Sequence, residues 1–266
     1  MSGLGERTVI INGQPCRVWE KGTGSPLGFL AGIAGLPRWT PFLDRLAGGH
    51  RVIVPSLPGF PGGLGHDQLD SQLDWIAATL DLLEAAGLAG ADLIGASLGG
   101  ALAAEAAALA PGFVRRLVLI APFGLYDEAA PPTDIWAQRP GALPGLLCRR
   151  AATYESFVAP PEGADAAEWS IAMVRASEAA ARLLWPLGDT RLARRLHRIR
   201  CPALVAWGDE DRVLSPNYAE RFARALGGEA AIALVPGAGH LAELDAPDLA
   251  ADMVMGFLAA GAAPAR

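Results

Sequence analysis

The chain is poor in cysteine and in long apolar runs. Its three cysteines, Cys16, Cys148 and Cys201, are odd in number, far apart and outside any C-x-x-C spacing, which argues against a disulfide framework and against a zinc site. No run approaches the roughly 20 apolar residues that cross a bilayer, and Glu6 and Arg7 interrupt the start before a signal-peptide core could form. We therefore expect a cytoplasmic protein with no membrane contact.

The chain also has no large excess of charge of one sign. The 22 Lys and Arg residues and 28 Asp and Glu residues give a formal net charge of −6. The basic residues are scattered or held in short clusters such as Arg194-Arg195, so the one-sided basic surface that nucleic acids require is missing. With 266 residues, 52% of them apolar, the chain can bury one large core or two small ones.

The order of apolar segments predicts an α/β protein with a mostly parallel sheet. Two short strands at residues 8–11 and 16–19 flank Asn12-Gly13, a dipeptide that favours a hairpin turn, so these strands should be antiparallel. Continuous apolar strands then alternate with helices, as in a parallel sheet covered on both faces. The further predicted strands are residues 26–31, 51–55, 91–96, 117–121, 202–207 and 231–235. The predicted helices are residues 39–47, 71–86, 98–110, 216–225 and 247–260.

Residues 122–200 break this alternation. They hold turn formers, scattered aromatic side chains and amphipathic helical pieces, but no strand pattern. A segment this long is not a structureless loop in a compact domain, so we expect a helical insertion on a core made of residues 1–121 and 201–266. The insertion is called the cap segment below. Its last part, residues 189–199, is basic on one face and apolar on the other, which predicts a surface helix.

The most informative segment is Gly95-Ala96-Ser97-Leu98-Gly99, which follows an apolar strand and opens an alanine-rich helix. This is the G-x-S-x-G pattern in the strand–turn–helix context that it requires. The serine must occupy a sharp turn with its hydroxyl above the sheet, and the two glycines leave room for neighbouring backbone. The turn also directs the backbone N–H of Leu98 toward negative charge that forms on an oxygen beside Ser97. Ser97 is therefore the candidate nucleophile and Leu98 a candidate oxyanion donor.

Two other interpretations of this segment compete. The pattern can mark a structural turn without chemistry, and Gly95-x-Ser97-x-x-Gly100 also resembles a dinucleotide-binding fingerprint. That fingerprint needs a middle glycine, so that the backbone can contact the pyrophosphate, and an acidic residue at the end of the next strand. Here Ser97 stands at the middle position, and Pro122-Phe123 follows the next strand. The serine interpretation is favoured over both.

A serine hydroxyl becomes a strong nucleophile when a base takes its proton, and the base is usually a histidine oriented by a carboxylate. His240 is the candidate base, because it follows a late strand at the carboxyl edge of the sheet, where ligands bind. His50 and His66 stand in loops around the second parallel strand and are expected to be solvated or locally hydrogen-bonded. His197 is expected on the surface.

The candidate orienting acid is Asp211. It lies in Gly208-Asp209-Glu210-Asp211-Arg212, after another strand and at the same edge of the sheet. Asp211 has the freedom to swing toward a histidine, whereas Asp209 at the strand's end fits an Asx-type turn. A carboxylate at position 211 would hold the imidazole in one tautomer and stabilise the imidazolium that forms when Ser97 attacks.

These residues and motifs make the chain resemble the α/β-hydrolase fold superfamily over essentially its whole length. The order Ser97, Asp211, His240 is the order that this family uses. Pro58-Gly59-Phe60, after the second parallel strand, is a further match. The resemblance implies a helical cap inserted at the position of the cap segment.

The resemblance also implies an oxyanion loop at Ala31-Gly32-Ile33-Ala34-Gly35, with the backbone N–H of Ile33 joining that of Leu98. The chain departs from the family at two places: the family commonly has His-Gly where this chain has Ala31-Gly32, and Asp where it has Ser56. Relatives that open epoxides or displace halide carry Asp at the nucleophile position, so Ser97 disfavours those activities.

Together these residues predict a serine hydrolase that cleaves a carboxylic ester or related acyl bond, with no metal and no organic cofactor. The expected partner is a small apolar ester-like substrate, and the oligomeric state stays open. Apolar side chains of the cap segment would either line the substrate pocket or pack the cap onto the sheet. These candidate substrate-binding residues are Trp136, Trp169, Met173 and Trp185.

Three other functions remain open at this point. Relatives that hydrolyse a carbon–carbon bond in a diketone-like ring-cleavage product also use Ser, Asp and His, although they tend to carry an aromatic residue where this chain has Leu241. A hydrolase-fold receptor would bind a small apolar ligand without turnover. Acyl transfer to an alcohol or to peroxide would differ from hydrolysis only in the nucleophile of the deacylation step.

Overall fold

An eight-stranded sheet forms the centre of the computed structural model, which describes residues 3–260. The strand order is β1-β2-β4-β3-β5-β6-β7-β8. All pairs from β4 to β8 are parallel, and β1 and β2 are antiparallel to their neighbours. The strands are β1 (Gly5–Ile11), β2 (Gln14–Lys21), β3 (Pro26–Leu30), β4 (Arg51–Pro55), β5 (Ala91–Ala96), β6 (Val114–Ile120), β7 (Ala203–Gly208) and β8 (Ala230–Val235).

The N-terminal hairpin is confirmed and is longer than predicted. Asn12 and Gly13 both have positive φ, +50° and +76°, the conformation that joins two strands by a two-residue turn. Pairing runs on to Gly5 and Glu20, beyond the apolar positions, because exposed side chains also stabilise the hairpin. Nε1 of Trp19 donates a hydrogen bond of 2.7 Å to Oε2 of Glu6.

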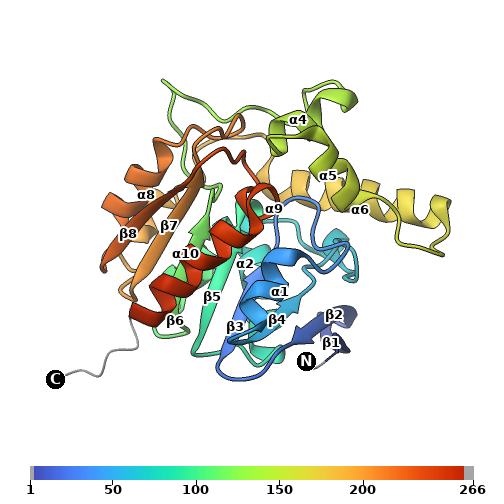
Figure 1. Cartoon of the computed structure of the whole chain (residues 1–266), viewed down its shortest axis with the longest axis horizontal. Coiled ribbons are helices and arrows are strands. Elements are labelled where there is room, and N and C mark those ends of the chain that lie inside the picture. The colour runs from blue at the N-terminus through green and yellow to red at the C-terminus, as the bar shows by residue number, and fades with distance from the viewer. Residues whose placement is uncertain (1–2, 261–266) are drawn as a thin grey trace.

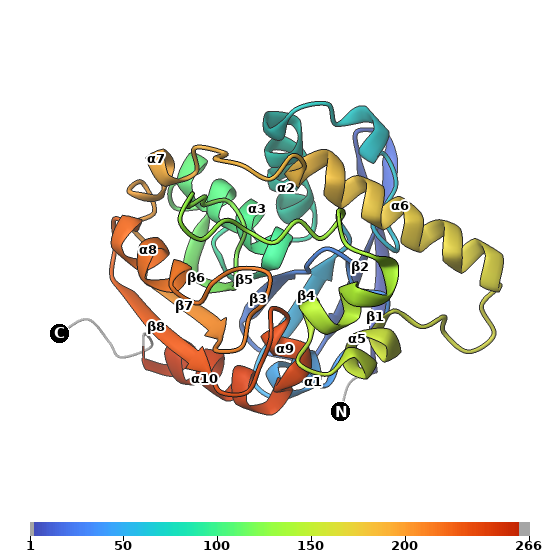
Figure 2. The same ribbon diagram turned by 90° about the horizontal axis from the view of Figure 1, so that it is seen from above.

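Helices cover both faces of the sheet, as the continuous apolar strands predicted. Figure 2 shows α2 (Gln72–Ala85), α3 (Ser97–Leu109) and α8 (Tyr218–Ala225) on one side. On the other side lie α1 (Pro41–Ala47) and α10 (Pro247–Ala260), which pack against each other. The strands β5, β6 and β7 between these layers are almost entirely buried. The candidate site lies at the carboxyl ends of these buried strands.

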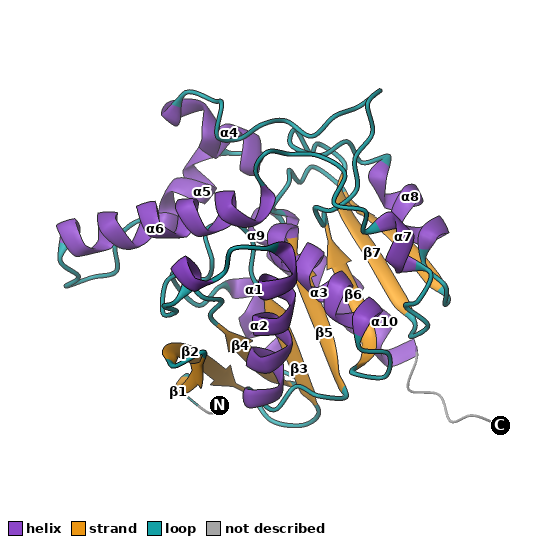
Figure 3. Ribbon diagram, turned by 180° about the vertical axis from the view of Figure 1, so that it is seen from behind, coloured by secondary structure: helices purple, strands orange, loops and turns teal. Residues whose placement is uncertain are grey.

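The cap segment contains helices and, among its described residues, no strand. Figures 1 and 3 show α4, α5 and α6 above the sheet, beyond the carboxyl ends of its strands. The helices are η2 (Pro140–Ala142), α4 (Leu143–Leu147), α5 (Ala151–Val158), α6 (Ala166–Leu184) and α7 (Ala193–Leu196). The boundaries of the cap at residues 122 and 200 stay a prediction.

The predicted helix over residues 189–199 was wrong in extent, since only Ala193–Leu196 is α-helical. Side chains at its start bind nearby backbone instead. Oδ1 of Asp189 accepts from the backbone N–H of Arg191 over 2.8 Å, and Arg191 has φ of +60°. Local side-chain bonds of this kind compete with helix formation.

No helix among residues 3–260 combines the length and apolarity needed to span a bilayer. The cytoplasmic location stays a prediction.

Candidate active site

Ser97 occupies a strained turn between β5 and α3. Its φ is +54°, in a region that residues with side chains rarely adopt. The glycines of the motif make this turn possible. A Cβ on Gly95 would lie 2.5 Å from the carbonyl oxygen of Gly99, and one on Gly99 would lie 2.3 Å from the carbonyl oxygen of Leu30. Neighbouring backbone therefore fills the space that any larger residue would need.

Three polar side chains from remote segments meet beside this turn. Nε2 of His240 lies 2.9 Å from Oγ of Ser97, and Nδ1 of His240 lies 2.9 Å from Oδ2 of Asp211. Ser97 and the side chains of His240 and Asp211 have no solvent exposure. The imidazole thus bridges the hydroxyl and the carboxylate, and this arrangement can carry a proton away from the hydroxyl.

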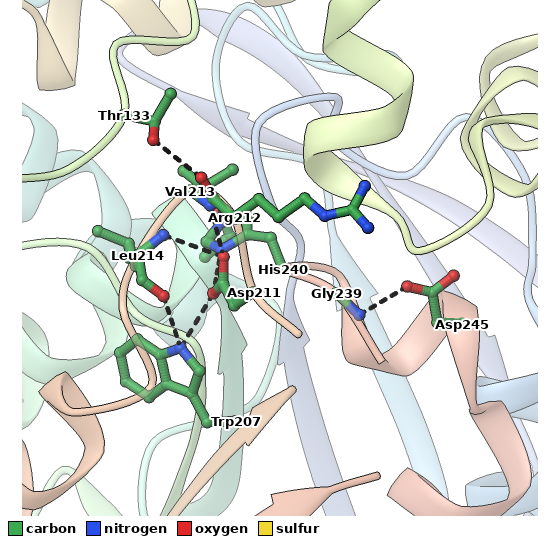
Figure 4. Close-up of polar contacts among 10 residues, drawn as sticks. Thr133, Trp207, Asp211, Arg212, Val213, Leu214, Gly239, His240 and Asp245 are labelled. Atoms are coloured by element: carbon green, nitrogen blue, oxygen red, sulfur yellow. Dashed lines mark hydrogen bonds and ion pairs between the residues drawn. The ribbon is translucent and has the colours of Figure 1, made fainter. Parts of the chain in front are cut away.

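The Asp211 carboxylate is held by donors from its own loop. Figure 4 shows the indole of Trp207 and the backbone of Leu214 directed at it. Nε1 of Trp207 donates to Oδ2 over 2.9 Å, and the N–H groups of Val213 and Leu214 donate to Oδ1 over 2.8 and 2.9 Å. These bonds leave the carboxylate one orientation, the one that faces His240. Sequence reasoning missed Trp207, although an indole that ends the strand before the acidic loop was an available signal.

Asp209 lies at the same edge of the sheet but serves another contact. Its Oδ1 accepts from the backbone N–H of Gly237 over 2.7 Å, in the turn that leads to His240. The carboxylate at position 209 therefore links the two loops, and the one at position 211 faces the imidazole.

The loop that carries His240 is fixed from two sides. The ring of Phe123 meets the imidazole edge-on, with ring centroids 5.4 Å apart. Oδ2 of Asp245 accepts from the backbone N–H of Gly239 over 2.8 Å (Figure 4). The same oxygen accepts from the backbone N–H of Arg149 over 2.6 Å, which ties this loop to the cap segment. Phe123 and Asp245 were both missed, because their contacts depend on the tertiary structure.

The predicted oxyanion loop, residues 31–35, lies directly against Ser97. A Cβ on Gly32 would come 3.1 Å from Cβ of Ser97 and 3.5 Å from its Oγ. The N–H of Gly35, at φ of +64°, donates to the carbonyl of Gly32 over 2.9 Å and closes the loop. On the other side of Ser97, Leu98 lies in the first turn of α3, whose N–H groups have no carbonyl partner within the helix. Ile33 and Leu98 therefore belong to the two backbone segments that flank the hydroxyl.

A cleft with about 970 Å³ of empty space, part of it open to solvent, lies between this loop and the cap segment. Its apolar lining includes two predicted substrate-binding residues, Trp136 and Met173, and one aromatic residue that sequence reasoning missed, Tyr154. The cleft can hold an apolar acyl or alcohol group next to the 31–35 loop.

The other two predicted substrate-binding residues lie elsewhere. Nε1 of Trp169, at the start of α6, donates to the carbonyl of Val158 over 2.9 Å and so packs α6 onto the end of α5. Trp185, just beyond α6, is 57% exposed, and its Nε1 lies 3.3 Å from Oδ2 of Asp134. Neither lines the cleft, since each is at an end of α6, whereas Met173 lies toward its middle.

The remaining histidines do not reach Ser97. His197 is exposed and His50 is half-buried, with its pKa lowered by burial. His66, expected in a solvated or hydrogen-bonded loop, is instead buried under α6, with Nε2 3.5 Å from Oε2 of Glu178. All three cysteines are free, and burial raises the pKa of Cys16 to about 11. Within residues 3–260, no group of three His, Cys, Asp or Glu side chains could hold a metal ion.

With this geometry established, comparison with known proteins identifies the family. The sequence matches the Alpha/beta hydrolase family over residues 11–253. The chain belongs to this family. The mostly parallel sheet flanked by helices confirms the predicted fold class.

Two curated relatives and one solved structure illustrate the likeness. The dihydrolipoyllysine-residue acetyltransferase component of the acetoin cleaving system of Pseudomonas putida is 30% identical over 93% of this chain and 68% of its own length. The 2-hydroxy-6-oxo-2,4-heptadienoate hydrolase of Pseudomonas putida is 32% identical, but only over half of each chain, 50% and 51%. Naproxen esterase from Bacillus subtilis superposes with a TM-score of 0.72 and 17% identity over 96% of this chain and 92% of its own, a likeness of fold.

Proposed function

We propose that this protein is a serine hydrolase that cleaves small carboxylic esters through an acyl-enzyme. The observation that carries the proposal is the pair of 2.9 Å contacts that His240 makes with Ser97 and Asp211. A hydroxyl, an imidazole and a carboxylate in this order form the proton relay of serine hydrolases. The mostly apolar cleft beside the 31–35 loop supports a substrate with an apolar acyl or alcohol part.

In the first half-reaction, Oγ of Ser97 forms a bond to the substrate carbonyl carbon, and its proton passes to Nε2 of His240. Negative charge develops on the carbonyl oxygen, where the backbone N–H groups of Leu98 and Ile33 stabilise it. Asp211 stabilises the imidazolium through Nδ1. The imidazolium then gives its proton to the leaving alcohol as the carbon–oxygen bond breaks, and the acyl group stays on Ser97.

In the second half-reaction, water attacks the acyl carbon while His240 takes its proton. The proton returns to Oγ of Ser97 as the acid leaves, and the protein is restored. No metal or organic cofactor enters these steps. The cap segment, residues 122–200, bounds the cleft and thereby selects the substrate.

Replacement of the nucleophile tests the proposal. Ser97→Ala should lower kcat for p-nitrophenyl butyrate by roughly four to six orders of magnitude, because no acyl-enzyme can form. Ser156→Ala is the matched control, since Ser156 is exposed on α5 and should leave turnover unchanged. Full activity in Ser97→Ala would disprove the proposal.

A second candidate activity is hydrolysis of a carbon–carbon bond. It is favoured by the 32% identity to the heptadienoate hydrolase over half of the chain, and the same three side chains could serve it. A substrate panel that pairs p-nitrophenyl butyrate with 2-hydroxy-6-oxo-2,4-heptadienoate separates the two activities by their kcat/KM values.

Two further alternatives, a receptor and an acyl transferase, predict different results. A receptor without turnover would bind an intact ester tightly but would not be labelled at Ser97 by a fluorophosphonate. An acyl transferase would yield the butyrate ester of an added alcohol faster than free butyrate.

A further inference from the structure

The strand β8 forms one end of the sheet, and its outer edge is unpaired. It bonds only to β7. The backbone groups of successive strand residues point alternately to the two sides. The carbonyl oxygens of Glu229 and Val235 accept from β7, so the N–H and C=O groups of Ala230, Ile232 and Leu234 point away from the sheet. None of these outward groups has a hydrogen-bond partner among residues 3–260.

This edge also lacks the features that keep strands apart. Ile232 and Leu234 are 45% and 49% exposed. The six residues of β8 include no charged residue and no proline, and their pairing with β7 runs without a register shift. Edge strands of natural proteins usually carry a charge, a proline or a bulge, which prevents pairing with a strand of another chain. The edge of β8 is therefore open to a further strand.

The strand at the other end of the sheet, β1, is protected in this way. It contains Glu6 and Arg7, and both side chains are bound to neighbouring parts of the fold. Glu6 accepts from the indole of Trp19, and Nη2 of Arg7 donates to the carbonyl of Ala86 over 2.7 Å. A strand added beside β1 would have to pack against these charges. Of the two end strands, β8 is thus the one that accepts a partner.

Charges beside β8 do not oppose a second copy of the chain. Figure 2 shows β8 as the outermost strand, between α8 on one face and α10 on the other. Every charged residue of these two helices lies in an ion pair. The pairs are Arg221–Asp127, Arg224–Glu220, and Arg45 with both Asp248 and Asp252. Although the chain carries a net charge of −6, a copy that approaches this edge meets helices whose charges are already paired.

We infer that β8 pairs with β8 of a second copy of this chain, antiparallel about a two-fold axis, so that two sheets become one. The axis passes through Ile232, because only this register pairs all three outward residues: Ile232 with the partner's Ile232, and Ala230 with the partner's Leu234. Opposed residues then exchange N–H and C=O bonds, and the interface is self-complementary. The two Glu229 residues, which precede the strands, lie about 20 Å apart. This inference is independent of the proposed function.

Analytical ultracentrifugation of the full chain tests the inference. Wild-type protein should sediment as a dimer at about 10 μM and dissociate on dilution. Ile232→Lys and Leu234→Lys place a protecting charge on the edge and should weaken dimerisation by roughly 30-fold or more. Ile10→Lys is the matched control, because Ile10 is 62% exposed on β1 and should leave the dimer intact. Circular dichroism shows whether each variant is folded.

A proline separates backbone pairing from apolar contact. Ile232→Pro removes an N–H group that points away from β7, so β8 should stay in its own sheet. The same change removes a donor at the centre of the dimer and should leave the protein monomeric at about 10 μM. A wild-type protein that is monomeric at about 100 μM, or a dimer that persists in both Ile232→Lys and Ile232→Pro, would overturn the inference.

Cysteine variants test the register. The two Ile232 Cα atoms should lie about 5.5 Å apart, within the range of a disulfide, so Ile232→Cys should form a disulfide-linked dimer on mild oxidation. Leu234→Cys would lie about 13 Å from its counterpart and should not cross-link. Wild-type protein, whose three cysteines are buried or half-buried, is the control. Cross-linking of Leu234→Cys but not of Ile232→Cys would overturn the antiparallel register centred on Ile232.

Discussion

Oδ2 of Asp211 is shared by two donors: Nε1 of Trp207, at 2.9 Å, and Nδ1 of His240, also at 2.9 Å. The indole ring is itself fixed, since it is fully buried and stacks on Tyr218 with ring planes 16° apart. The hydroxyl of Tyr218 in turn donates to the carbonyl of Ala130 over 2.9 Å. The orientation of the carboxylate is therefore set by the packing of β7 against α8 and the start of the cap segment.

Removal of the carboxylate charge should affect the proposed reaction far more than the fold. Asp211→Asn should lower kcat by about 10⁴-fold, as loss of the orienting acid does in comparable triads, because the imidazolium loses its partner and the tautomer is no longer fixed. Asp209→Asn is the matched control, since Asp209 binds Gly237 and not the imidazole. Steady-state kinetics with p-nitrophenyl butyrate checks both, and equal losses in the two variants would contradict the assignment.

Trp207→Phe should lower kcat by roughly tenfold while KM stays the same, because Asp211 keeps its two backbone donors but loses the indole. The lost hydrogen bond should also cost about 1 kcal/mol of the free energy of unfolding. Urea unfolding measures the second effect separately from the first. A stability loss with unchanged kcat would show that the indole only packs the core.

The glycines of the motif differ in their tolerance of a side chain. Gly99→Ala should prevent correct folding of the turn, because the new Cβ would lie 2.3 Å from the carbonyl oxygen of Leu30. Gly256→Ala, in α10, meets nothing within 4 Å and should raise the free energy of unfolding by about 0.5–1 kcal/mol. Thermal unfolding of both variants checks this, and a stable Gly99→Ala protein would contradict the close packing at Ser97.

The sequence predicted the elements whose local chemistry is decisive. A serine between glycines after an apolar strand requires the observed turn, and the alternation of apolar strands with helices requires a covered parallel sheet. The same reasoning favoured Asp211 over Asp209, and in the structure Asp211 faces His240. The Asx-type turn predicted at Asp209 was wrong, because its carboxylate accepts from the backbone N–H of Gly237 in a separate loop. The catalytic roles of these residues stay predictions, which the variants above test.

Contacts between segments that are far apart in the chain could not be predicted from the sequence. Oε2 of Glu243, which is buried without a hydrogen-bond partner among the described residues, is one example. The 31–35 loop and the end of α5 lie close to Glu243 in space, and neither is near it in the chain. The helical periodicity of residues 189–199 was real, but side-chain bonds by Asp189 and Thr190 shorten the helix. Trp169 and Trp185 illustrate the same limit, because composition alone does not tell which side of the cap an indole faces.

Access to the site should depend on Arg38. Ser97 and His240 are inaccessible in this structure, so a substrate enters only after the surroundings move. The guanidinium of Arg38, just beyond the 31–35 loop, donates to the carbonyls of Phe157, over 3.0 Å, and of Ala159, at the end of α5. Arg38→Met keeps the apolar stem but removes these donors, and a fluorophosphonate should label Ser97 several-fold faster.

The control for this variant is Arg224→Met, which removes an exposed i,i+4 ion pair with Glu220 on α8 and should not change the labelling rate. The rate is measured at subsaturating probe, so that it reports access and not the chemical step. Slower or equal labelling of Arg38→Met would mean that the site opens by another movement.

Glu243 should make the stability of the protein depend on pH. Burial raises its pKa from the ordinary 4.5 to about 7, and the nearby Asp245 adds to this effect while His240 opposes it. Between pH 4.5 and about 7 the Glu243 carboxyl is ionised in the unfolded chain but protonated in the folded protein. The free energy of unfolding therefore falls as the pH rises through this range. Glu243→Gln should therefore stabilise the protein near pH 8.5 by up to about 3 kcal/mol and much less near pH 5. Urea unfolding at both pH values checks this, with Glu155→Gln, at an exposed position of α5, as the control. An equal gain at the two pH values would mean that folding does not raise the pKa of Glu243.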